Sequence, residues 1–239
     1  MRTAAVVAVK PFSTAKQRLA GRLDPSARAA LVEAMFRDVL AALLQVARIE
    51  HVIVVTPNPT IAAAARAAGA TVVEDDERGY SAAALAGIRC ALAAGIERVV
   101  LVPGDTPLVD SVELDTLLAE PSAPGSPPTP SVVVVPDYHG AGTNALLLAP
   151  PDVIAPAFGP GSCARHAAAA RAAGARVRVA HVASLALDVD TPAELEAYRR
   201  MHLQISDGET RTRSGDTTIF RRHEQMRADS CGFWPRRGG

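Results

Sequence analysis

Short apolar runs alternate with alanine-rich helical segments over the first 110 residues, and this alternation most constrains the fold. Residues 4–9, 51–56 and 98–102 are continuous, mostly β-branched runs that predict buried strands. The segments between them carry apolar residues at helical spacing, and one opens with Asp24 and Pro25, typical of an N-cap and first helical residue. This rhythm predicts right-handed βαβ units and a mainly parallel sheet. A content of 49% hydrophobic but only 4% aromatic residues suits a core of Ala, Val and Leu.

The alternation changes after the Pro/Ser/Gly-rich stretch at residues 122–130, which predicts a surface loop. Two apolar runs, 132–135 and 145–148, follow too closely for a parallel crossover and predict an antiparallel pair. A helix over 162–173 and a strand over 176–182 complete the pattern. The fold class is therefore α/β, with a mainly parallel sheet and one antiparallel pair.

The apolar pattern ends near residue 200. Thr191-Pro192-Ala193-Glu194 predicts a last helix, opened by a capping box with Pro at its first position. Residues 201–239 mix Arg, Asp, Glu, Thr and Gly without an apolar period and contain the only tryptophan, Trp234. We therefore expect one domain over residues 1–200 and a disordered or loosely attached tail over 201–239.

Charge and cysteine content exclude several classes of partner. The formal net charge is zero, so nothing electrostatic indicates nucleic acid or an anionic membrane as a partner. Three cysteines, without metal-ligand spacing or an even count, indicate a reducing, cytoplasmic setting. We expect neither a signal peptide nor a membrane span, because no apolar stretch approaches about 18 residues.

Lysine usage singles out one loop. Among 25 Lys and Arg residues only two are lysines, Lys10 and Lys16, and both lie in the loop after the first predicted strand. Arginine serves as the cation elsewhere, so these two positions indicate a need for a compact ammonium rather than a planar guanidinium. The first loop of an α/β sheet is also a place where phosphates bind. The alternative is an ordinary basic strand-to-helix turn, in which Ser13 or Thr14 caps a helix.

Acidic residues end two further apolar runs. Asp105 follows residues 99–102, and Asp188 and Asp190 follow residues 185–187. The carboxyl ends of strands form the ligand crevice of an open α/β sheet, and converging carboxylates there suit Mg²⁺ with a nucleotide's phosphates. The alternative is that these aspartates are helix caps, although Thr191 already supplies the cap of the last predicted helix.

A third group of candidates consists of small residues. They are Gly142-Thr143-Asn144, Gly159 and Ser162. Glycine lets the backbone approach an anion closely. Small hydroxyl groups and the N–H groups at a predicted helix start bind phosphate or carboxylate. His166 lies one helical turn after Ser162 and is a secondary candidate, because a helix-surface histidine is the commoner interpretation.

Five motifs, in this order, resemble the CofC/FbiD family of guanylyltransferases from biosynthesis of the deazaflavin hydride carrier coenzyme F-420. They are K-P-F-x-x-A-K-x-R-L, P-G-D-x-P-L, G-T-N-A-L-L-L, F-G-x-x-S-x-x-x-H and L-D-V-D-T-P-x-E-L. The resemblance covers about residues 1–200. It implies a nucleotidyltransferase fold similar to the glycosyltransferase-A type.

The resemblance also implies a set of site residues and ligands. GTP and a divalent metal, Mg²⁺, are the implied nucleotide substrate and cofactor, and the acceptor is phosphoenolpyruvate, 2-phospho-L-lactate or 3-phospho-D-glycerate. The implied residues are Lys10 and Lys16 (catalytic and GTP-binding), Arg18 and Ser81 (GTP-binding), Thr143, Asn144, Gly159, Ser162 and His166 (acid-binding), and Asp105, Asp188 and Asp190 (metal).

One departure and several alternatives stay open. Relatives usually have Gly-Leu-Asn where this chain has Gly79-Tyr80-Ser81, and a serine hydroxyl is shorter than an asparagine amide, so the choice of base or acid is open. Other enzymes of the same fold, molybdopterin or sugar-phosphate nucleotidyltransferases, carry a Gly-rich first loop where Lys10-Pro11-Phe12 stands here. The remaining alternative is a non-enzymatic nucleotide-sensing domain.

Overall fold

The computed structural model describes residues 1–10, 16–76, 78–119 and 129–200. Backbone contacts divide the chain into two units, Met1–Glu194 and Leu195–Gly239. The predicted tail, 201–239 with Trp234, lies outside the described residues, as do residues 122–128 of the loop predicted over 122–130. The fold below is that of the first unit.

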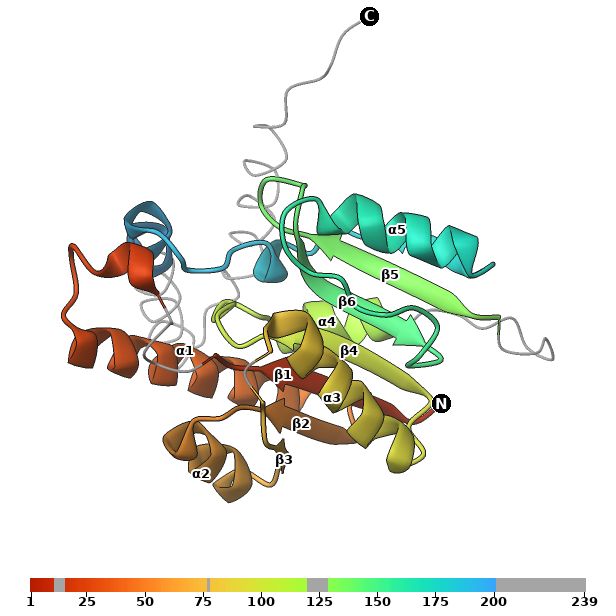
Figure 1. The fold of residues 1–239 in the computed structure, drawn as a ribbon, viewed down its shortest axis with the longest axis horizontal. Helices are drawn as coiled ribbons and strands as arrows, with labels where there is room; N and C mark the ends of the chain where they lie inside the picture. The colour runs from red at the N-terminus through yellow and green to blue at the C-terminus, as the bar shows by residue number, and fades with distance from the viewer. Residues whose placement is uncertain (11–15, 77, 120–128, 201–239) are drawn as a thin grey trace, which may run out of the picture. The chain divides into compact units, whose positions relative to one another are not determined.

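A seven-stranded sheet in the order β3-β2-β1-β4-β6-β5-β7 forms the centre of this unit (Figure 1). Strands β1, β2, β3 and β4 are mutually parallel, β6 is antiparallel to both β4 and β5, and β7 is parallel to β5. The predicted α/β class with its antiparallel pair is therefore confirmed. The strands are β1 Thr3–Ala8, β2 His51–Val55, β3 Thr71–Val73, β4 Arg98–Pro103, β5 Ser131–Pro136, β6 Thr143–Ala149 and β7 Arg176–Val179.

Three helices begin at a residue whose side chain caps them. The Asp24 carboxylate accepts a hydrogen bond from the N–H of Ala27, and Asn58 caps the next helix in the same way. Asp110 caps a short helix, α4, which the sequence pattern alone did not predict. The helices are α1 Pro25–Gln45, α2 Pro59–Ala67, α3 Tyr80–Ala93, α4 Ser111–Leu118 and α5 Ser162–Ala172, with 3-10 turns at Gln17–Leu19 and Ala183–Leu185. Residues 192–200 are also helical.

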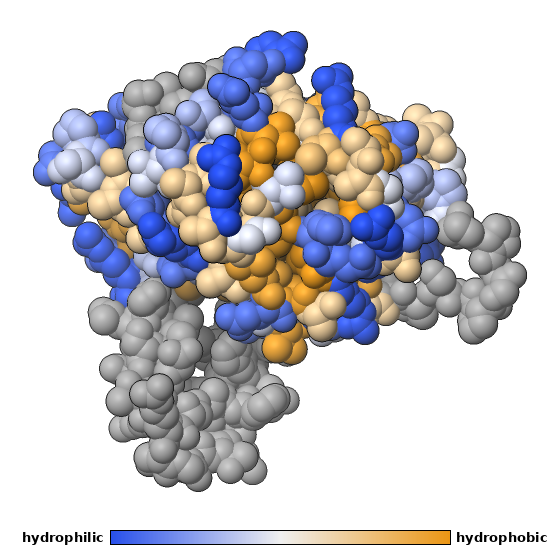
Figure 2. Space-filling view, turned by 90° about the horizontal axis from the view of Figure 1, so that it is seen from below, coloured by the Kyte–Doolittle hydropathy of each residue, from blue (hydrophilic) through white to orange (hydrophobic). Residues whose placement is uncertain are grey.

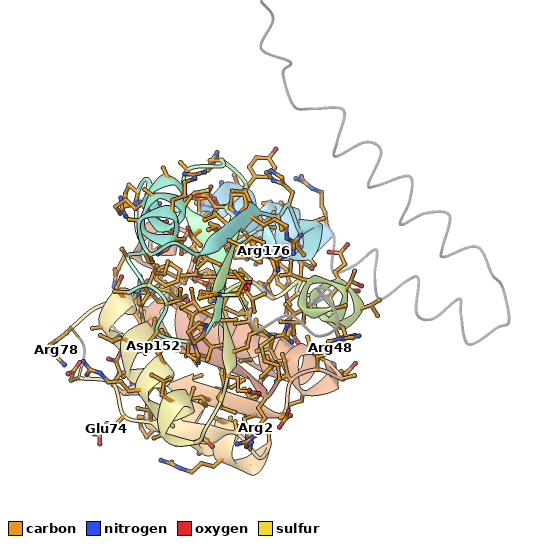
Figure 3. All side chains as sticks on the ribbon, turned by 90° about the vertical axis from the view of Figure 1, so that its right-hand side faces the viewer. Arg2, Arg48, Glu74, Arg78, Asp152 and Arg176 are labelled. Atoms are coloured by element: carbon orange, nitrogen blue, oxygen red, sulfur yellow. The ribbon has the colours of Figure 1, made fainter. Side chains whose placement is uncertain are left out.

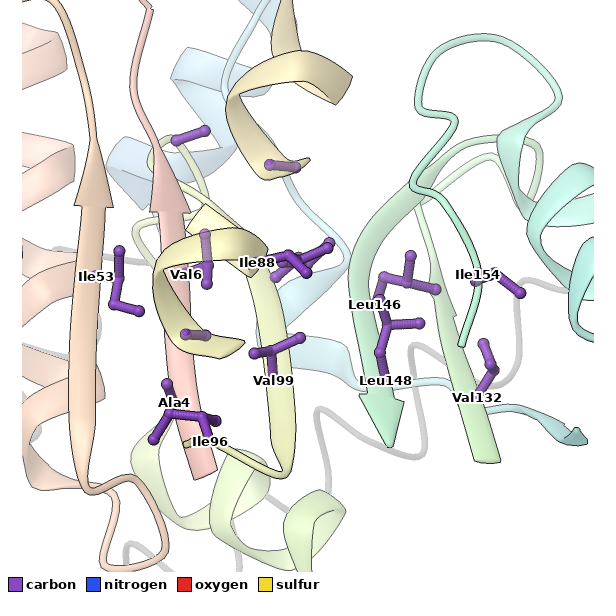
Figure 4. Packing of buried hydrophobic residues seen from close by; sticks show 14 of the residues in the cluster. Ala4, Val6, Ile53, Ile88, Ile96, Val99, Val132, Leu146, Leu148 and Ile154 are labelled. Carbon is purple, nitrogen blue, oxygen red and sulfur yellow. The ribbon is translucent and has the colours of Figure 1, made fainter. Parts of the chain in front are cut away.

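Helices cover both faces of the sheet. Alternate β1 residues, Ala4, Val6 and Ala8, belong to one apolar cluster with α3 and α5 (Figure 4). The intervening residues face the other side, where α1 contributes a fully buried Phe36 and α4 a fully buried Leu114. Strand order reverses between β1 and β4, so the carboxyl ends of these two strands form the topological switch point at which such sheets bind ligands.

Gly87 allows α3 to approach the sheet closely. A Cβ at this position would lie 2.2 Å from Val6 Cγ1 and 3.2 Å from Val55 Cγ2. At an open helical position Gly→Ala would stabilise the fold by about 1 kcal/mol. At Gly87 the added methyl group would overpack the core, so the substitution should destabilise the fold. We expect Gly87→Ala to lower the free energy of unfolding by about 1–3 kcal/mol in urea titrations. Gly21→Ala, whose Cβ would meet nothing within 4 Å, is the control, and equal midpoints for both variants would contradict this packing.

Arginine is the surface cation of this chain. Arg2, Arg48 and Arg78 project from the periphery, where they pair with Glu50, Asp115 and Asp76 respectively (Figure 3). Figure 2 shows apolar residues exposed in the middle of one face with hydrophilic residues around them. Among the described residues, the helices are all too short or too polar to cross a membrane.

Candidate active site

The two lysines of the first loop occupy different environments. Lys10 is exposed at the end of β1, whereas Lys16 is buried, and the loop between them lies outside the described residues. The backbone of Lys16 is left-handed, with φ 55° and ψ 35°, and its carbonyl accepts a hydrogen bond from the N–H of Leu19. Leu19 is fully buried, so it anchors the backbone of Lys16 to the core.

The Lys16 ammonium lies between two of the predicted metal ligands. Its Nζ donates to Asp105 Oδ2 at 2.5 Å and to Asp190 Oδ1 at 2.8 Å. The lysine side chain is only 4% exposed, while the two carboxylates are 33% and 44% exposed. The acidic pair is therefore closed on the protein side by a lysine and open on the solvent side.

The charges of Lys16 and Asp190 each favour the ionised form of the other residue. Burial by itself lowers the pKa of Lys16, but Asp105 and Asp190 raise it, and the net pKa is above its ordinary value. Burial likewise raises the pKa of Asp190, yet the charges of Lys16, Lys10 and Arg18 bring it below the ordinary value. The basic loop and the acidic cluster therefore act on the same region, and this pair stays ionised at neutral pH.

Asp188 differs from its two neighbours. Burial first, and then the negative charges of Asp105 and Asp190, raises its pKa. The N–H of the next residue, Val189, donates to the Asp105 carbonyl, so the backbone that carries Asp188 lies beside Asp105. No salt bridge joins it to a cation within the described residues. Carboxylate oxygens are the ligands that Mg²⁺ takes, although the described residues contain no group of three acidic, His or Cys side chains already arranged around a metal position. The donor chemistry fits a divalent cation, and the Lys16 ammonium lies between two of the three donors.

Residues 186–190 reach the site as an irregular segment that follows the 3-10 turn at Ala183–Leu185. The Asn144 amide on β6 donates to the carbonyls of Leu185 and Ala186 at 2.9 and 3.0 Å. The N–H of Val189 donates to the Asp105 carbonyl at 3.2 Å. Asn144, predicted to bind the acid, therefore uses its amide nitrogen to hold the segment that carries Asp188 and Asp190.

The capping box predicted at residues 191–194 is present. The Glu194 carboxylate accepts from the N–H groups of Asp190 and Thr191 at 2.8 and 2.6 Å, and the N–H of Glu194 donates to Thr191 Oγ1 at 3.4 Å. The cap is thus supplied by Thr191 and Glu194, which leaves the carboxylates of Asp188 and Asp190 out of the capping interaction.

Thr143, Ser162 and His166 form a second, buried cluster. Ser162 Oγ donates to Thr143 Oγ1 at 3.1 Å, and His166 Nδ1 lies 3.0 Å from the same oxygen. Because His166 Nε2 accepts from the N–H of Ala157 at 2.8 Å, the neutral ring carries its proton on Nδ1 and donates it to Thr143. His166 is fully buried, which corrects its interpretation as a surface histidine.

Aromatic contacts connect helix α3 to the second cluster, and the sequence analysis missed them. The Tyr80 and Phe158 rings lie edge to face with their centroids 4.7 Å apart, and the Phe158 and His166 rings do so with centroids 5.1 Å apart.

Ser81 Oγ, predicted to contact GTP, accepts a hydrogen bond from the N–H of Phe158 at 3.0 Å. Burial and the charge of Asp105 raise the pKa of Tyr80. The loop with Gly159, whose φ is 109°, is therefore held between α3 and α5. Aromatic residues are scarce in this sequence, and Tyr80 and Phe158 each stand next to a predicted site residue, Ser81 and Gly159, which is the signal that could have indicated these contacts.

His166 predicts a pH-dependent stability. Burial, and secondly the charge of Arg165, lowers its pKa to about 4 from an unfolded value near 6.5. The depressed pKa contributes stability that is present above about pH 6.5 and is lost as the pH falls toward 4. We expect the free energy of unfolding in urea to fall by about 2 kcal/mol between pH 7 and pH 5 from this group. The curve of His166→Gln should lack this fall, and parallel curves for the two proteins would contradict it.

The fold of this chain is similar to that of nucleotidyltransferases, and a buried lysine lies beside an acidic cluster at the switch point of its sheet. A nucleotidyl transferase from Methanothermobacter thermautotroptrophicus shares the fold with a TM-score of 0.59 at 20% identity, covering 85% of this chain and 99% of that one. A family model described as "Guanylyl transferase CofC like" matches residues 3–210. The chain belongs to this family, and the resemblance of its five motifs is confirmed.

Two relatives carry specific names. A phosphoenolpyruvate guanylyltransferase of Conexibacter woesei is 43% identical over 214 residues, which cover 89% of this chain and 94% of that protein. A 3-phospho-D-glycerate guanylyltransferase of Phenylobacterium zucineum is 36% identical over 198 residues, covering 80% of this chain and 86% of that protein. The predicted enzyme class, a guanylyltransferase, is confirmed.

Proposed function

We propose that this enzyme transfers GMP from GTP to a phosphorylated three-carbon acid and releases pyrophosphate. The observation that carries this proposal is the Lys16 ammonium between Asp105 and Asp190, with the charges of Lys10 and Arg18 acting on the same carboxylate. An acidic cluster beside several cations is suited to a nucleotide triphosphate with a divalent cation. It gives no advantage to an uncharged ligand.

Lys10, Lys16 and Arg18 would hold the GTP phosphates, and the carboxylates of Asp105, Asp188 and Asp190 would hold Mg²⁺. Bound Mg²⁺ supplies positive charge that offsets the negative charge developing on the phosphate oxygens. The lysines add compact charges and fix the orientation of the triphosphate.

The acid would bind beside Thr143 and the first turn of α5. Thr143 Oγ1 accepts from both Ser162 and His166, so its own hydroxyl proton is left to be donated to another acceptor. The N-terminus of α5 adds the partial positive charge of a helix end near Gly159. A phosphate or carboxylate group matches both features.

The transfer proceeds in one step between the two substrates. A phosphate oxygen of the acid forms a bond to the α-phosphorus of GTP, and the bond from that phosphorus to the bridging oxygen breaks, so pyrophosphate leaves with the electron pair. No protein nucleophile is needed. Burial and the charge of Asp137 raise the pKa of Cys163, which keeps it a thiol, and Ser162 is fully buried.

We infer phosphoenolpyruvate as the first acid to test, because the Conexibacter relative carries that name at 43% identity. 3-Phospho-D-glycerate and 2-phospho-L-lactate are the alternatives, and the product would be a precursor in coenzyme F-420 biosynthesis in the cytoplasm. The partners on this proposal are small molecules only, not nucleic acid or membrane.

The experiment is a pyrophosphate-release assay with purified protein, GTP, Mg²⁺ and each acid in turn, with the diphosphate-linked guanosine product identified by mass. We expect one acid to support turnover, with ATP and CTP much poorer than GTP. Absence of release with all three acids would contradict the proposal. Release that depends on a sugar phosphate instead would move the enzyme to the sugar-nucleotide class.

A further inference from the structure

The position of Lys16 raises a question that its role on phosphates does not answer. Its ammonium lies within hydrogen-bond distance of Asp105 Oδ2 and Asp190 Oδ1, and these oxygens are also proposed ligands of the metal. Mg²⁺ binds oxygens at about 2.0–2.1 Å with little tolerance of geometry. The ammonium and the metal therefore cannot lie between the same two oxygens at the same time.

We propose that the Lys16 ammonium and a divalent cation are alternative occupants of the Asp105–Asp190 pair. Lys16 holds the two carboxylates together before substrate arrives, and its side chain leaves them for the nucleotide phosphates when the metal enters. This inference rests on the proposed function, because it takes the aspartates as the metal ligands and GTP as the new partner of Lys16.

The backbone of Lys16 confines this exchange to the side chain. Leu19 is fully buried and its N–H donates to the Lys16 carbonyl at 2.9 Å, so the Cα is anchored. The four-carbon stem of lysine is flexible and carries a compact charge, which lets one nitrogen serve two sets of oxygens in turn. An arginine fork would need a matched planar acceptor at both positions.

Two consequences follow for metal binding. Without nucleotide, the metal competes with a tethered cation, so its apparent affinity is reduced by the fraction of molecules in which the pair is free. With GTP present, Lys16 has another partner and the metal binds more tightly. By linkage, nucleotide and metal then strengthen each other's binding by the same factor.

The wild-type protein offers a direct test, because the chain has only two lysines. Brief acylation with an amine-reactive reagent, followed by peptide mass spectrometry, reports Lys16 with Lys10 as the internal reference. We expect Lys16 to be protected without metal and its acylation relative to Lys10 to rise about tenfold in saturating Mn²⁺ without nucleotide, if the pair is free in about one molecule in ten at rest. GTP added with the metal should protect it again. An unchanged Lys16 signal at metal concentrations that support turnover would overturn the proposal.

The matched variants are Lys16→Gln and Lys10→Gln, which remove one charge each from the same loop. Titration of Mn²⁺ by electron paramagnetic resonance, without nucleotide, should show about tenfold tighter binding for Lys16→Gln and about twofold or less for Lys10→Gln. Equal or weaker binding by Lys16→Gln, with a melting temperature close to the wild type, would overturn the inference. The readouts separate the two proposals. Absence of turnover by the wild-type protein with every acid contradicts the proposed function alone. Wild-type turnover, combined with metal binding by Lys16→Gln that is no tighter than that of the wild type, contradicts this inference alone.

Discussion

Asp188→Asn and Asp190→Asn are both expected to lower the rate of pyrophosphate release by on the order of a thousandfold. A neutral amide retains the shape of the carboxylate but not the charge that balances Mg²⁺. The exposed Asp152→Asn is the matched control, since it removes the same charge at the opposite edge of the sheet: Asp152 follows β6, which is antiparallel to β4. Wild-type-like rates in both variants would contradict the assignment of these residues to the metal.

The two variants should differ in stability, which separates a metal role from a structural one. Burial and the neighbouring charges disfavour the ionised form of Asp188, so Asp188→Asn should melt at the wild-type temperature or above it. Asp190→Asn removes one of the two carboxylates that compensate the buried Lys16, so it should melt lower. Both melting curves would be measured without metal. The opposite order would contradict the charge distribution described here.

Lys10→Arg and Lys16→Arg should already be costly, although both keep the positive charge. At Lys16, a planar guanidinium does not fit where a single nitrogen lies 2.5 and 2.8 Å from two carboxylates. A displacement of the phosphates by about 1 Å can cost on the order of a hundredfold in rate. Turnover of GTP is the measurement for each variant.

The control for these substitutions is Arg37→Lys on the exposed face of α1, where Arg37 pairs with Glu33. An ordinary surface turn would tolerate arginine, because arginine is the cation that this chain uses on its surface. A loss confined to the two loop variants supports phosphate binding. Three indistinguishable rates would show that the two lysines are not retained for a compact charge.

Local patterns predicted most of the elements because local chemistry decides them. Asp24 and the box at Thr191 and Glu194 cap helices as predicted, since capping depends on residues three positions apart. The antiparallel arrangement of β5 and β6 followed from the short link between them. Helix α4 escaped prediction because its eight residues are too few to establish a helical period.

The segment before Asp188 shows where local pattern fails. Residues 185–187 are apolar, as a buried strand would be, yet Leu185 ends a 3-10 turn and is fully buried there. Its carbonyl is satisfied by the side chain of Asn144 rather than by a neighbouring strand. The strand predicted over 176–182 ends earlier, at Val179. As an edge strand, β7 pairs with β5 alone, and this pairing stops at Val179.

The sequence by itself determined the α/β class, the caps, and the residue types of the site, because composition, spacing and motif order carry those. Only the tertiary structure decided which of these residues meet. Lys16 and Asp190 are 174 positions apart, and they lie together because strands β1 and β4 pair side by side and Asn144 holds the later segment against them. The burial of His166 and the contact of Tyr80 with Phe158 likewise depend on how α3 and α5 pack on the sheet. Such contacts depend on packing between distant segments, which no local pattern records.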